Sequence, residues 1–405
     1  MGSGKTRSFF SWLLLASFSF LLYVVFSPNP YEVTPQKALN QREDPKQKPA
    51  NSHDAIKGEM GCDFSKGKWV RDPGGPAYTN TTCRTLPESK SCVQYGKDPE
   101  YLNWRWKPND CELPRFDARM FLDIVRGKRM AFAGDSVARN QLDSLLCLLS
   151  QVETPLDVHK DAEDKFRTWY FKSYDFTIMK LWTRFLVEET ERQINGSASG
   201  LFDLHLDRID TKWTEKLPLI NYLVISDGHW FFRKNYLYEG GKLIGCMFCS
   251  EANLTDLGIN YTVQRAFRTT LEYLSKCEKC EGLLTFLRTF TPAHFENGTW
   301  NDGGNCRRTR PVNEGDVSFS GTDWELRNVQ VEEVKKLQVE KQKGAKRFML
   351  LDVTEAMMMR PDAHPGTHWN NQWMRGYNDC LHWCLPGPID MWNDLLFAVL
   401  KEETP

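Results

Sequence analysis

The chain has 405 residues and a formal net charge of −1, so it lacks the overall positive charge that would favour nucleic acid as a partner. This length allows one large domain or two modest ones. Aromatic residues make up 13% of the chain, with 14 tryptophans, and this mildly favours a carbohydrate ligand because exposed indoles stack on sugar rings. Trp104 and Trp106 invite that role, but we expect at least one of them to pack in the core.

The N-terminal region contains a run without charges, residues 9–26, that is long enough to span a bilayer. Lys5 and Arg7 precede it, so the positive-inside rule places residues 1–8 in the cytosol and the rest of the chain across the membrane. The run is longer than the apolar part of a usual signal peptide, and Ser27–Pro30 is not a small-x-small cleavage site. We therefore expect a retained signal-anchor in a single-pass type II protein.

The cysteines and sequons indicate that the body of the chain lies in an oxidising compartment. All 12 cysteines follow the anchor, and an even number there indicates disulfides. Cys246-x-x-Cys249 and Cys277-x-x-Cys280 have the outline of a zinc site, but in this compartment we favour disulfides among these four, without a bound metal. Five Asn-x-Ser/Thr sequons predict glycosylated surface loops, at Asn80, Asn195, Asn253, Asn260 and Asn297.

Composition divides the rest of the chain into a stem and a folded body. Residues 27–60 are rich in Pro, Lys and Gln, contain few large apolar residues, and should form a flexible stem. The catalytic domain is expected at 61–402. Its first part, 61–125, is dense in cysteines and aromatics with little periodicity, which predicts a disulfide-tied wrapping lobe beside an α/β body at 126–402.

Hydrophobic patterns predict alternating strands and helices in the body. In chain order, we expect a strand at 129–133, a helix after Ser136, strands at 175–187 and 222–226, a helix at 261–277, a strand at 283–290, a helix at 325–343, a strand at 347–353, and a turn followed by a helix at 383–400. This alternation predicts a three-layer α/β sandwich with a mostly parallel sheet. Ligands bind beyond the carboxyl ends of such strands, so the irregular stretches 188–220 and 227–260 are candidate substrate loops.

Two short motifs predict a serine-nucleophile site. Gly134-Asp135-Ser136 lies where a strand turns into a helix, so the hydroxyl should be exposed near backbone N–H groups that can stabilise an oxyanion. A serine needs a base, and the base needs a group that holds its tautomer. Asp379-x-x-His382 can supply both, because residues three apart on a helical turn share a face. Gly-Asp-Ser alone is common in turns, so the pair of motifs carries the hypothesis.

Several neighbouring polar residues have a functional and a structural interpretation. Asp135 is expected to cap the helix that follows it. Arg139 and Asn140 could hold an oxyanion or an acyl donor, or form structural hydrogen bonds. Gly228 and His229 follow a strand and should face the cleft, although a structural histidine is equally compatible with the pattern. The structural interpretation also fits the other candidate histidines, His294, His364 and His368.

The segments 132–141 and 379–387, which carry these motifs, resemble the plant trichome birefringence-like (PC-esterase) family. Further matching segments are Cys62-Asp63-Phe64, Asn103–Pro108, Gly228-His229-Trp230 and His294-Phe295 running on to Gly303–Cys306. Members of this family are Golgi type II membrane proteins that O-acetylate cell-wall polysaccharides on a fold related to the SGNH/GDSL serine esterases. The resemblance implies that Ser136 is the nucleophile, His382 the general base and Asp379 its orienting acid, with an acetyl-serine intermediate that a sugar hydroxyl attacks.

The resemblance also implies a disulfide pattern and a branch of the family. The implied pairs are Cys62–Cys111, Cys83–Cys147, Cys92–Cys384 and Cys306–Cys380. The run 226–233 and the two Cys-x-x-Cys motifs are most similar to the xyloglucan branch, which implies a Golgi enzyme that acetylates side-chain galactose, at O-6. Many relatives carry Asn in place of Ser226, which speaks against an oxyanion role for this side chain.

Other functions remain open at the level of sequence. The acceptor could be xylan or another hemicellulose instead of xyloglucan. An acetyl esterase would use the same three residues with water as the acceptor, and the difference lies in whether the closed cleft excludes water. A non-catalytic polysaccharide-binding protein would not need all three residues. No dinucleotide or phosphate loop is present, so we expect no bound cofactor and an acetyl donor that is acetyl-CoA or an unidentified carrier.

Overall fold

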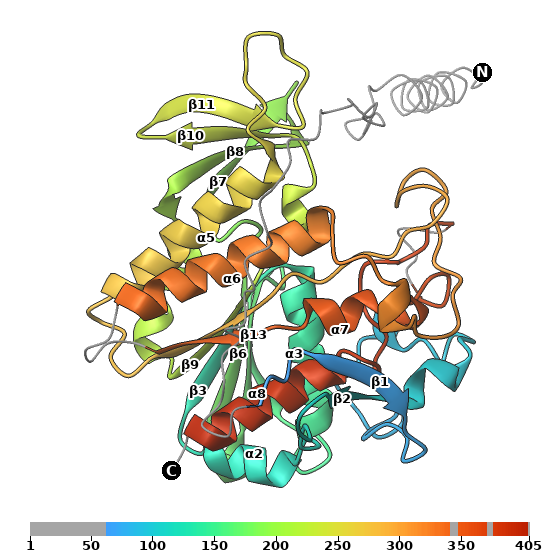
Figure 1. The fold of residues 1–405 in the computed structure, drawn as a ribbon. Helices are drawn as coiled ribbons and strands as arrows, with labels where there is room; N and C mark the ends of the chain where they lie inside the picture. The colour runs from blue at the N-terminus through green and yellow to red at the C-terminus, as the bar shows by residue number, and fades with distance from the viewer. Residues whose placement is uncertain (1–61, 341–346, 371–375, 404–405) are drawn as a thin grey trace, which may run out of the picture.

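A seven-stranded sheet forms the centre of the computed structural model, which describes residues 62–340, 347–370 and 376–403 (Figure 1). From one edge to the other, its strands are β13 (Arg347–Leu351), β12 (Leu284–Arg288), β9 (Tyr222–Ser226), β3 (Arg129–Gly134), β6 (Phe176–Trp182), β5 (Phe166–Phe171) and β4 (Leu156–Lys160). The pairs from β13 to β6 are all parallel, and β5 and β4 add an antiparallel edge. The mostly parallel sheet predicted from the sequence is confirmed.

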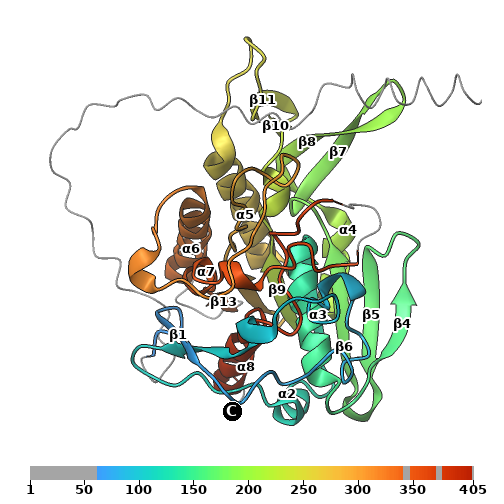
Figure 2. The same ribbon diagram turned by 90° about the vertical axis from the view of Figure 1, so that its right-hand side faces the viewer.

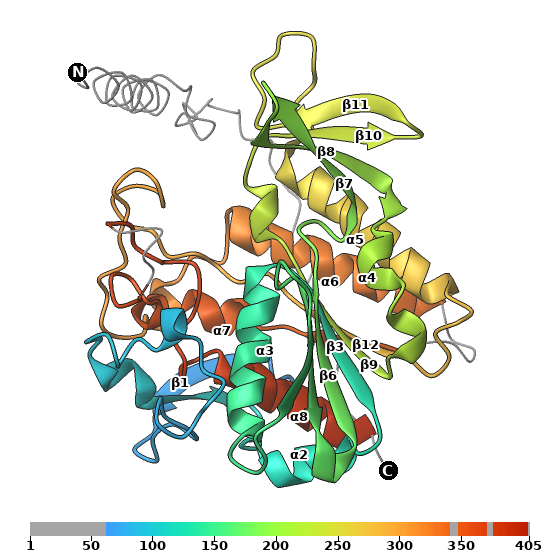
Figure 3. The same ribbon diagram turned by 180° about the vertical axis from the view of Figure 1, so that it is seen from behind.

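Helices cover both faces of this sheet (Figures 1 and 3). The helices are α2 (Ala118–Ile124), α3 (Ser136–Leu149) and α8 (Asp390–Glu403) on one face, and α5 (Gly258–Lys276) and α6 (Thr322–Glu340) on the other. Strand side chains alternate between the two cores, because successive residues of a strand point to opposite faces. Met130 and Phe132 of β3 pack in the core beneath α3 and α8, whereas Ala131 and Ala133 pack in the core beneath α5 and α6. This is the predicted three-layer sandwich.

The strand predicted at 175–187 is two strands. β6 ends at Trp182, and β7 (Val187–Ile194) begins after a short break in which Leu186 has a left-handed backbone with φ of 64°. A β-branched or bulky residue rarely adopts this conformation, so it marks a sharp change of chain direction. The antiparallel strands β4 and β5 were not predicted.

The stretches 188–220 and 227–260 were predicted as irregular substrate loops. The prediction of irregular structure is wrong, whereas contact of these stretches with substrate stays a prediction. They form most of a second sheet, in which β8 (Ser197–Ile209) pairs with β7 and with β10 (Asn235–Glu239), and β10 pairs with β11 (Lys242–Met247). A short helix, α4 (Thr211–Thr214), follows β8. The second sheet projects beyond α5 (Figures 1 and 2). The sequence explains why β8 forms a strand. Phe202, Leu204 and Leu206 alternate with polar residues and are buried in the core that contains α5.

The N-terminal part of the described chain forms a minor lobe. Its two-stranded ribbon, β1 (Gly67–Arg71) and β2 (Trp104–Pro108), lies beside α7 (Thr354–Met358) and α8 (Figures 1 and 2). Trp106 is buried, and its indole N–H donates to the Phe64 carbonyl at 2.8 Å, so one of the two tryptophans considered for sugar stacking packs in the core.

The described chain contains six disulfides, of which Cys83–Cys147 and Cys92–Cys384 tie the minor lobe to the body. The structure pairs the cysteines as Cys62–Cys111, Cys83–Cys147, Cys92–Cys384, Cys306–Cys380, Cys246–Cys249 and Cys277–Cys280. The first four are the pairs that the family resemblance implies. The last two resolve the pairing that the sequence left open, and each closes within its own Cys-x-x-Cys motif.

Two sets of expectations concern the membrane and the glycans. The expected anchor at 9–26 and stem at 27–60 lie outside the described residues, and within the described ranges no helix is both long and apolar enough to cross a membrane.

The sequon asparagines are exposed at Asn80, Asn195, Asn253 and Asn297. Asn260 differs, because it is half-buried and its Nδ2, the atom that would carry a glycan, donates to Glu325 Oε2 at 2.7 Å.

Candidate active site

Ser136 is the first residue of α3 and lies at the carboxyl edge of the parallel strands, where it is half-buried. The turn that presents it requires glycine at position 134. Gly134 has a φ of 148°, and a Cβ atom at this position would lie 1.7 Å from the carbonyl oxygen of Ser226 on the neighbouring strand. Only a residue without a side chain allows β3 and β9 to stay in register here, and this fixes where α3 begins.

Asp135 caps the helix, as the sequence predicts. Its Oδ1 accepts the backbone N–H of Val137 at 2.8 Å, and its Oδ2 accepts that of His229 at 3.2 Å. Burial raises the pKa of Asp135, but the hydrogen bond and charge of His229 and the Val137 N–H outweigh burial and lower the pKa to about 2. Asp135 is therefore ionised, and it joins the nucleophile's helix to the loop after β9.

His229 has the structural role that the sequence left open. Its Nε2 lies 2.9 Å from the Thr291 carbonyl oxygen, and its ring stacks on Phe290 with 4.5 Å between centroids. The adjacent Gly228 has a φ of 158°, and a Cβ there would lie 2.5 Å from the Phe290 ring. Gly228 and His229 thus position Asp135 and the loop, and their predicted substrate contacts stay untested predictions.

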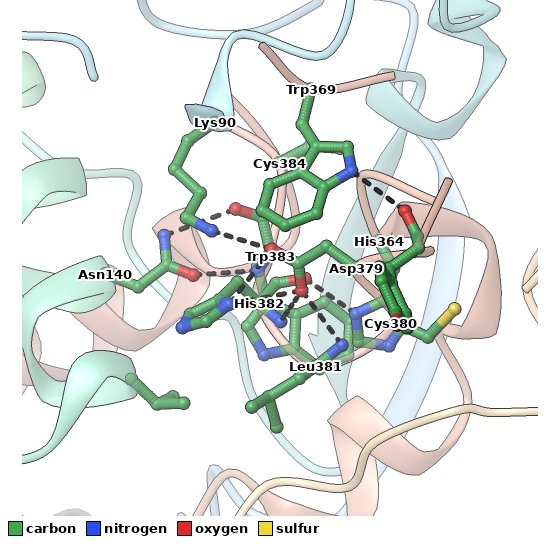
Figure 4. A network of polar contacts seen from close by, with 12 residues as sticks. Lys90, Asn140, His364, Trp369, Asp379, Cys380, Leu381, His382, Trp383 and Cys384 are labelled. Carbon is green, nitrogen blue, oxygen red and sulfur yellow. Dashed lines mark hydrogen bonds and ion pairs between the residues drawn. The ribbon is translucent and has the colours of Figure 1, made fainter. Parts of the chain in front are cut away.

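Asp379 and His382 form a hydrogen-bonded pair on the loop before α8 (Figure 4). His382 Nδ1 lies 3.0 Å from Asp379 Oδ2 and 3.1 Å from Oδ1. Asp379 Oδ1 also accepts the backbone N–H groups of Leu381 and His382, so the carboxylate organises its own loop. An ionised carboxylate only accepts hydrogen bonds, so the proton of the imidazole is on Nδ1 and Nε2 carries the free lone pair.

Both members of this pair are held in the ionisation state that a general base requires. Burial raises the pKa of Asp379, but the charges of His382 and Lys90 outweigh it and hold the pKa well below 3.8. Burial lowers the pKa of His382 below 6.5, because the attraction of Asp379 offsets burial only in part and Lys90 adds repulsion. At neutral pH the pair is therefore a carboxylate beside a neutral imidazole, which can accept a proton.

Lys90 is a site residue that sequence reasoning missed. It lies in the minor lobe, is nearly buried, and its Nζ is 2.9 Å from Asp379 Oδ2 (Figure 4). Its backbone carbonyl also accepts the N–H of Leu385, three residues beyond the histidine. The sequence does contain a signal: Cys92 is two residues away, and its implied disulfide partner Cys384 is two residues from His382.

Two histidines, the buried His364 and the half-buried His294, support the loop that carries Asp379 and His382. His364 Nδ1 lies 2.7 Å from the backbone carbonyl oxygen of His382, and His364 Nε2 lies 2.7 Å from His294 Nδ1. Burial holds the pKa of His364 well below 6.5 and lowers that of His294 to about 4, so both rings are neutral. The structural interpretation of these two residues is correct. His368 contacts the Tyr95 carbonyl oxygen instead, at 3.0 Å.

Asn140 connects the two halves of the site. It is buried on α3 one turn after Ser136, and both ends of its amide bind the backbone of Trp383: Oδ1 accepts the N–H at 2.7 Å and Nδ2 donates to the carbonyl at 3.2 Å (Figure 4). Both ends of the amide are thus bound to one backbone unit, which favours a positioning role over an oxyanion contact. Trp383 follows His382 directly, so Asn140 fixes the histidine's loop against the nucleophile's helix.

Ser136, the predicted nucleophile, is free of competing hydrogen bonds among the residues that the structure describes. Within the described part of the chain, neither the hydroxyl nor the backbone N–H of Ser136 forms a hydrogen bond. Catalytic hydrogen bonds commonly tighten only when substrate is bound. Arg139 is partly exposed and lies 3.6 Å from Asp143, one turn further along α3.

The lowered pKa of His382 predicts an acidic limit to activity. As pH falls through this pKa, the imidazole becomes charged and can no longer accept a proton, so kcat/KM falls towards acid pH with a midpoint below 6.5. A pH profile of kcat/KM measures this midpoint. A kcat/KM that does not fall at acid pH, or one whose acidic fall has its midpoint above pH 6.5, contradicts the assignment of His382 as the base.

Replacing Lys90 by Met should move the acidic fall of kcat/KM to higher pH. The substitution removes a positive charge that lowers the pKa of His382 and keeps an unbranched side chain in a nearly buried position. We also expect kcat/KM to fall by about tenfold, because Asp379 loses a charged hydrogen bond. Lys172→Met, at an exposed position, is the matched control. If the midpoint of the acidic fall is the same in Lys90→Met as in the wild type, Lys90 does not affect the pKa of His382.

Comparison with known proteins places the chain among relatives of similar length. Residues 113–399 match the GDSL/SGNH-like acyl-esterase family found in Pmr5 and Cas1p, and residues 60–112 match the PMR5 N-terminal domain. Xyloglucan O-acetyltransferases 4 and 3 of Populus trichocarpa are 56% and 50% identical, over 85% and 98% of this chain and 82% and 97% of theirs. Xyloglucan O-acetyltransferase 2 of Arabidopsis thaliana is 48% identical over 84% of this chain and 83% of its own.

Proposed function

The chain belongs to the GDSL/SGNH-like acyl-esterase family found in Pmr5 and Cas1p, and from this premise we propose that it is a xyloglucan O-acetyltransferase. The observation that carries the proposal is the hydrogen-bonded pair of an ionised Asp379 and a neutral His382. Asn140 fixes the loop of this pair to the helix that begins with Ser136. Relatives at 48–56% identity over most of the chain that are named xyloglucan O-acetyltransferases support the acceptor.

The reaction proceeds in two acyl transfers. In the first, Ser136 Oγ attacks the carbonyl carbon of the acetyl donor while His382 Nε2 takes the hydroxyl proton; the tetrahedral intermediate collapses to acetyl-serine, and the leaving group departs with that proton. In the second, a sugar hydroxyl gives its proton to His382 and attacks the acetyl-serine. Collapse releases the acetylated sugar and returns the proton to Ser136. Asp379 stabilises the imidazolium formed in each half.

The same geometry supports a site for the developing negative charge. The backbone N–H of Ser136 lies at the N-terminus of α3, where the helix dipole favours an anion, and it is not used by another group in the described structure. The N–H of Val137 is already taken by Asp135. We therefore assign the Ser136 N–H as one oxyanion donor.

Two half-buried tryptophans beside the nucleophile are suited to hold the sugar acceptor. Trp182 ends β6 directly opposite Gly134 of β3, and Trp230 follows His229. Their rings meet edge to face with 6.3 Å between centroids, and Arg184 and Arg233 lie over the Trp230 ring at 4.9 and 3.9 Å. In this proposal the two rings, in strand register with the turn that carries Ser136, contact the sugar ring of the acceptor.

The remaining parts of the proposal rest on the family resemblance. The acetylated position is O-6 of side-chain galactose, the donor is acetyl-CoA or another acetyl carrier, and no cofactor stays bound. Residues 9–26 anchor the protein in the Golgi membrane as a single-pass type II protein, with the catalytic domain in the lumen. The positive residues before this run and the sequons after it support that orientation.

An acceptor competition tests the function. The full chain in detergent is incubated with an acetyl donor and with xyloglucan or xylan oligosaccharides, and the mass of each oligosaccharide is followed together with free acetate. We expect acetyl groups on xyloglucan oligosaccharides and little gain on xylan. Acetylation of xylan alone would show that the acceptor is xylan and not xyloglucan. Release of acetate without any acetylated sugar would show that the protein is an esterase.

A further inference from the structure

A cavity of about 330 Å³ lies between the minor lobe and the start of α8. Trp69, Trp104 and Trp106 of the β1–β2 ribbon line it, and Asp390 and Asp394, one helical turn apart on α8, line it as well. This volume is at the small end of ligand pockets, which matches a ligand the size of one or two sugar rings.

The cavity is separate from the catalytic centre. Leu148, near the end of α3, contributes to its lining. Ser136 begins the same helix twelve residues earlier, and at 1.5 Å per residue this places the two about 18 Å apart along the helix axis. None of Ser136, Asp379 and His382 lines the cavity.

Buried donors without partners point to a missing ligand. The Tyr101 hydroxyl and the Trp104 indole N–H have no hydrogen-bond partner within the described structure, and Tyr101 is only 2% exposed. Tyr101 lines the cavity, and its Cε2, next to the carbon that bears the hydroxyl, lies 3.7 Å from where a Cβ on Gly387 would be. Buried polar groups are normally hydrogen-bonded, so an unpaired pair in one cavity requires an explanation.

The two carboxyl groups complete a polar lining. Asp390 accepts hydrogen bonds from Tyr78 at 2.7 Å and from Ser144 at 2.5 Å, and Asp394 accepts the Phe116 N–H at 2.9 Å. Burial raises the pKa of Asp390 to about 6 and that of Asp394 to about 7.

Arg105 and Arg115 also line the cavity, but Arg105 donates to the Leu113 carbonyl at 2.8 Å and Arg115 is paired with Asp72 at 2.6 Å. The two carboxyl groups on α8 therefore face the cavity without a paired cation in the described structure, which disfavours a phosphate-bearing ligand such as a nucleotide. They suit a neutral molecule whose hydroxyl groups can donate to them.

We propose that this cavity binds a pyranose unit of a glycan, with indole rings against the sugar ring, carboxyl oxygens accepting its hydroxyl protons, and the Tyr101 hydroxyl and Trp104 N–H donating to its oxygens. Arg71 stacks over the Trp104 ring at 4.4 Å and fixes its orientation. On the premise of the proposed function, the glycan is the acceptor polysaccharide, held at a second point remote from the reacting hydroxyl.

Calorimetric titration of the full chain with a short xyloglucan oligosaccharide tests the cavity directly. We expect two binding sites. Tyr101→Phe should weaken one of them by about two- to tenfold, the range for one lost hydrogen bond, and should not lower the melting temperature because the removed hydroxyl had no partner. Asp394→Asn, which can still accept the Phe116 N–H, should weaken the same site. Tyr273→Phe, on an exposed part of α5, is the matched control.

The outcomes separate this inference from the proposed function. A single site, or two sites that Tyr101→Phe and Asp394→Asn leave unchanged, overturns the glycan site in the cavity whether or not the protein transfers acetyl groups. A lower melting temperature in Tyr101→Phe without any change in binding gives the hydroxyl a purely structural role and overturns it as well. Weakened binding in a protein that shows no acetyl transfer supports the cavity and rejects the transferase.

Discussion

Replacing Ser136 by Ala should reduce kcat for acetyl transfer by about 10⁴-fold or more, while the fold and acceptor binding stay intact. The loss is large because the substitution removes the only atom to which the acetyl group is attached between the two transfers. The side chain forms no hydrogen bond in the described structure, so alanine leaves no buried group without a partner. Initial rates with a xyloglucan oligosaccharide measure the effect, and the melting temperature checks the fold.

Ser173→Ala provides the matched control for this experiment. Ser173 is exposed in the short helical turn between β5 and β6, and its bond to Glu153 comes from the backbone N–H, which alanine keeps, so the change should leave kcat unaltered. A Ser136→Ala enzyme that retains more than a few per cent of the wild-type kcat would exclude an acetyl-serine intermediate. The Asp379–His382 pair would then act on a sugar hydroxyl directly, in a single displacement.

Asp379→Asn should lower kcat by about 10⁴-fold, because an amide can neither stabilise the imidazolium nor enforce a proton on Nδ1 of His382. The amide oxygen can still accept the Leu381 and His382 N–H groups, so the loop is expected to keep its shape. In this variant Lys90 loses its charged partner. Because the ammonium group is nearly buried, leaving it unpaired should lower the free energy of unfolding by a few kcal/mol.

The control for the aspartate is Asp302→Asn, an exposed residue between the paired cysteine Cys306 and α5. Steady-state rates and melting temperatures of both variants, together with an Asp379→Asn, Lys90→Met double variant, separate the two effects. The double variant should recover stability but not kcat, because it removes the unpaired buried charge and leaves the imidazole without its carboxylate. Recovery of kcat would show that Asp379 serves only to neutralise Lys90.

The sequence was sufficient for the part of the fold that carries the nucleophile. The apolar run of β3, the Gly134 turn and the helical spacing after Ser136 are local signals, and β3 and α3 formed as predicted. It was insufficient for the second sheet. The prediction of an irregular stretch at 188–220 missed the alternation in β8. The buried side chains of this strand pack against α5, more than fifty residues further along the chain.

The candidate site shows the same division between local and distant information. The Asp379–His382 hydrogen bond joins residues three apart, as the spacing predicts, but the two lie on a loop and not on a helical turn. Lys90 and His364 act on this pair from segments that the linear pattern does not connect to it. The disulfide Cys92–Cys384 and the bond from the Leu385 N–H to the Lys90 carbonyl hold Lys90 beside the histidine's loop. Nothing in the apolar pattern of the sequence marks a buried lysine as an ion-pair partner.

Trapping of the acyl-enzyme tests the central claim most directly. The full chain is mixed with an acetyl donor in the absence of acceptor, quenched, digested, and analysed by peptide mass spectrometry. We expect a single acetyl group on the peptide that contains Ser136, absent in Ser136→Ala, and its transfer to a xyloglucan oligosaccharide when acceptor is added before the quench. An oligosaccharide that becomes acetylated while Ser136 is never modified, or an acetyl-serine that only releases acetate to water, would contradict the account.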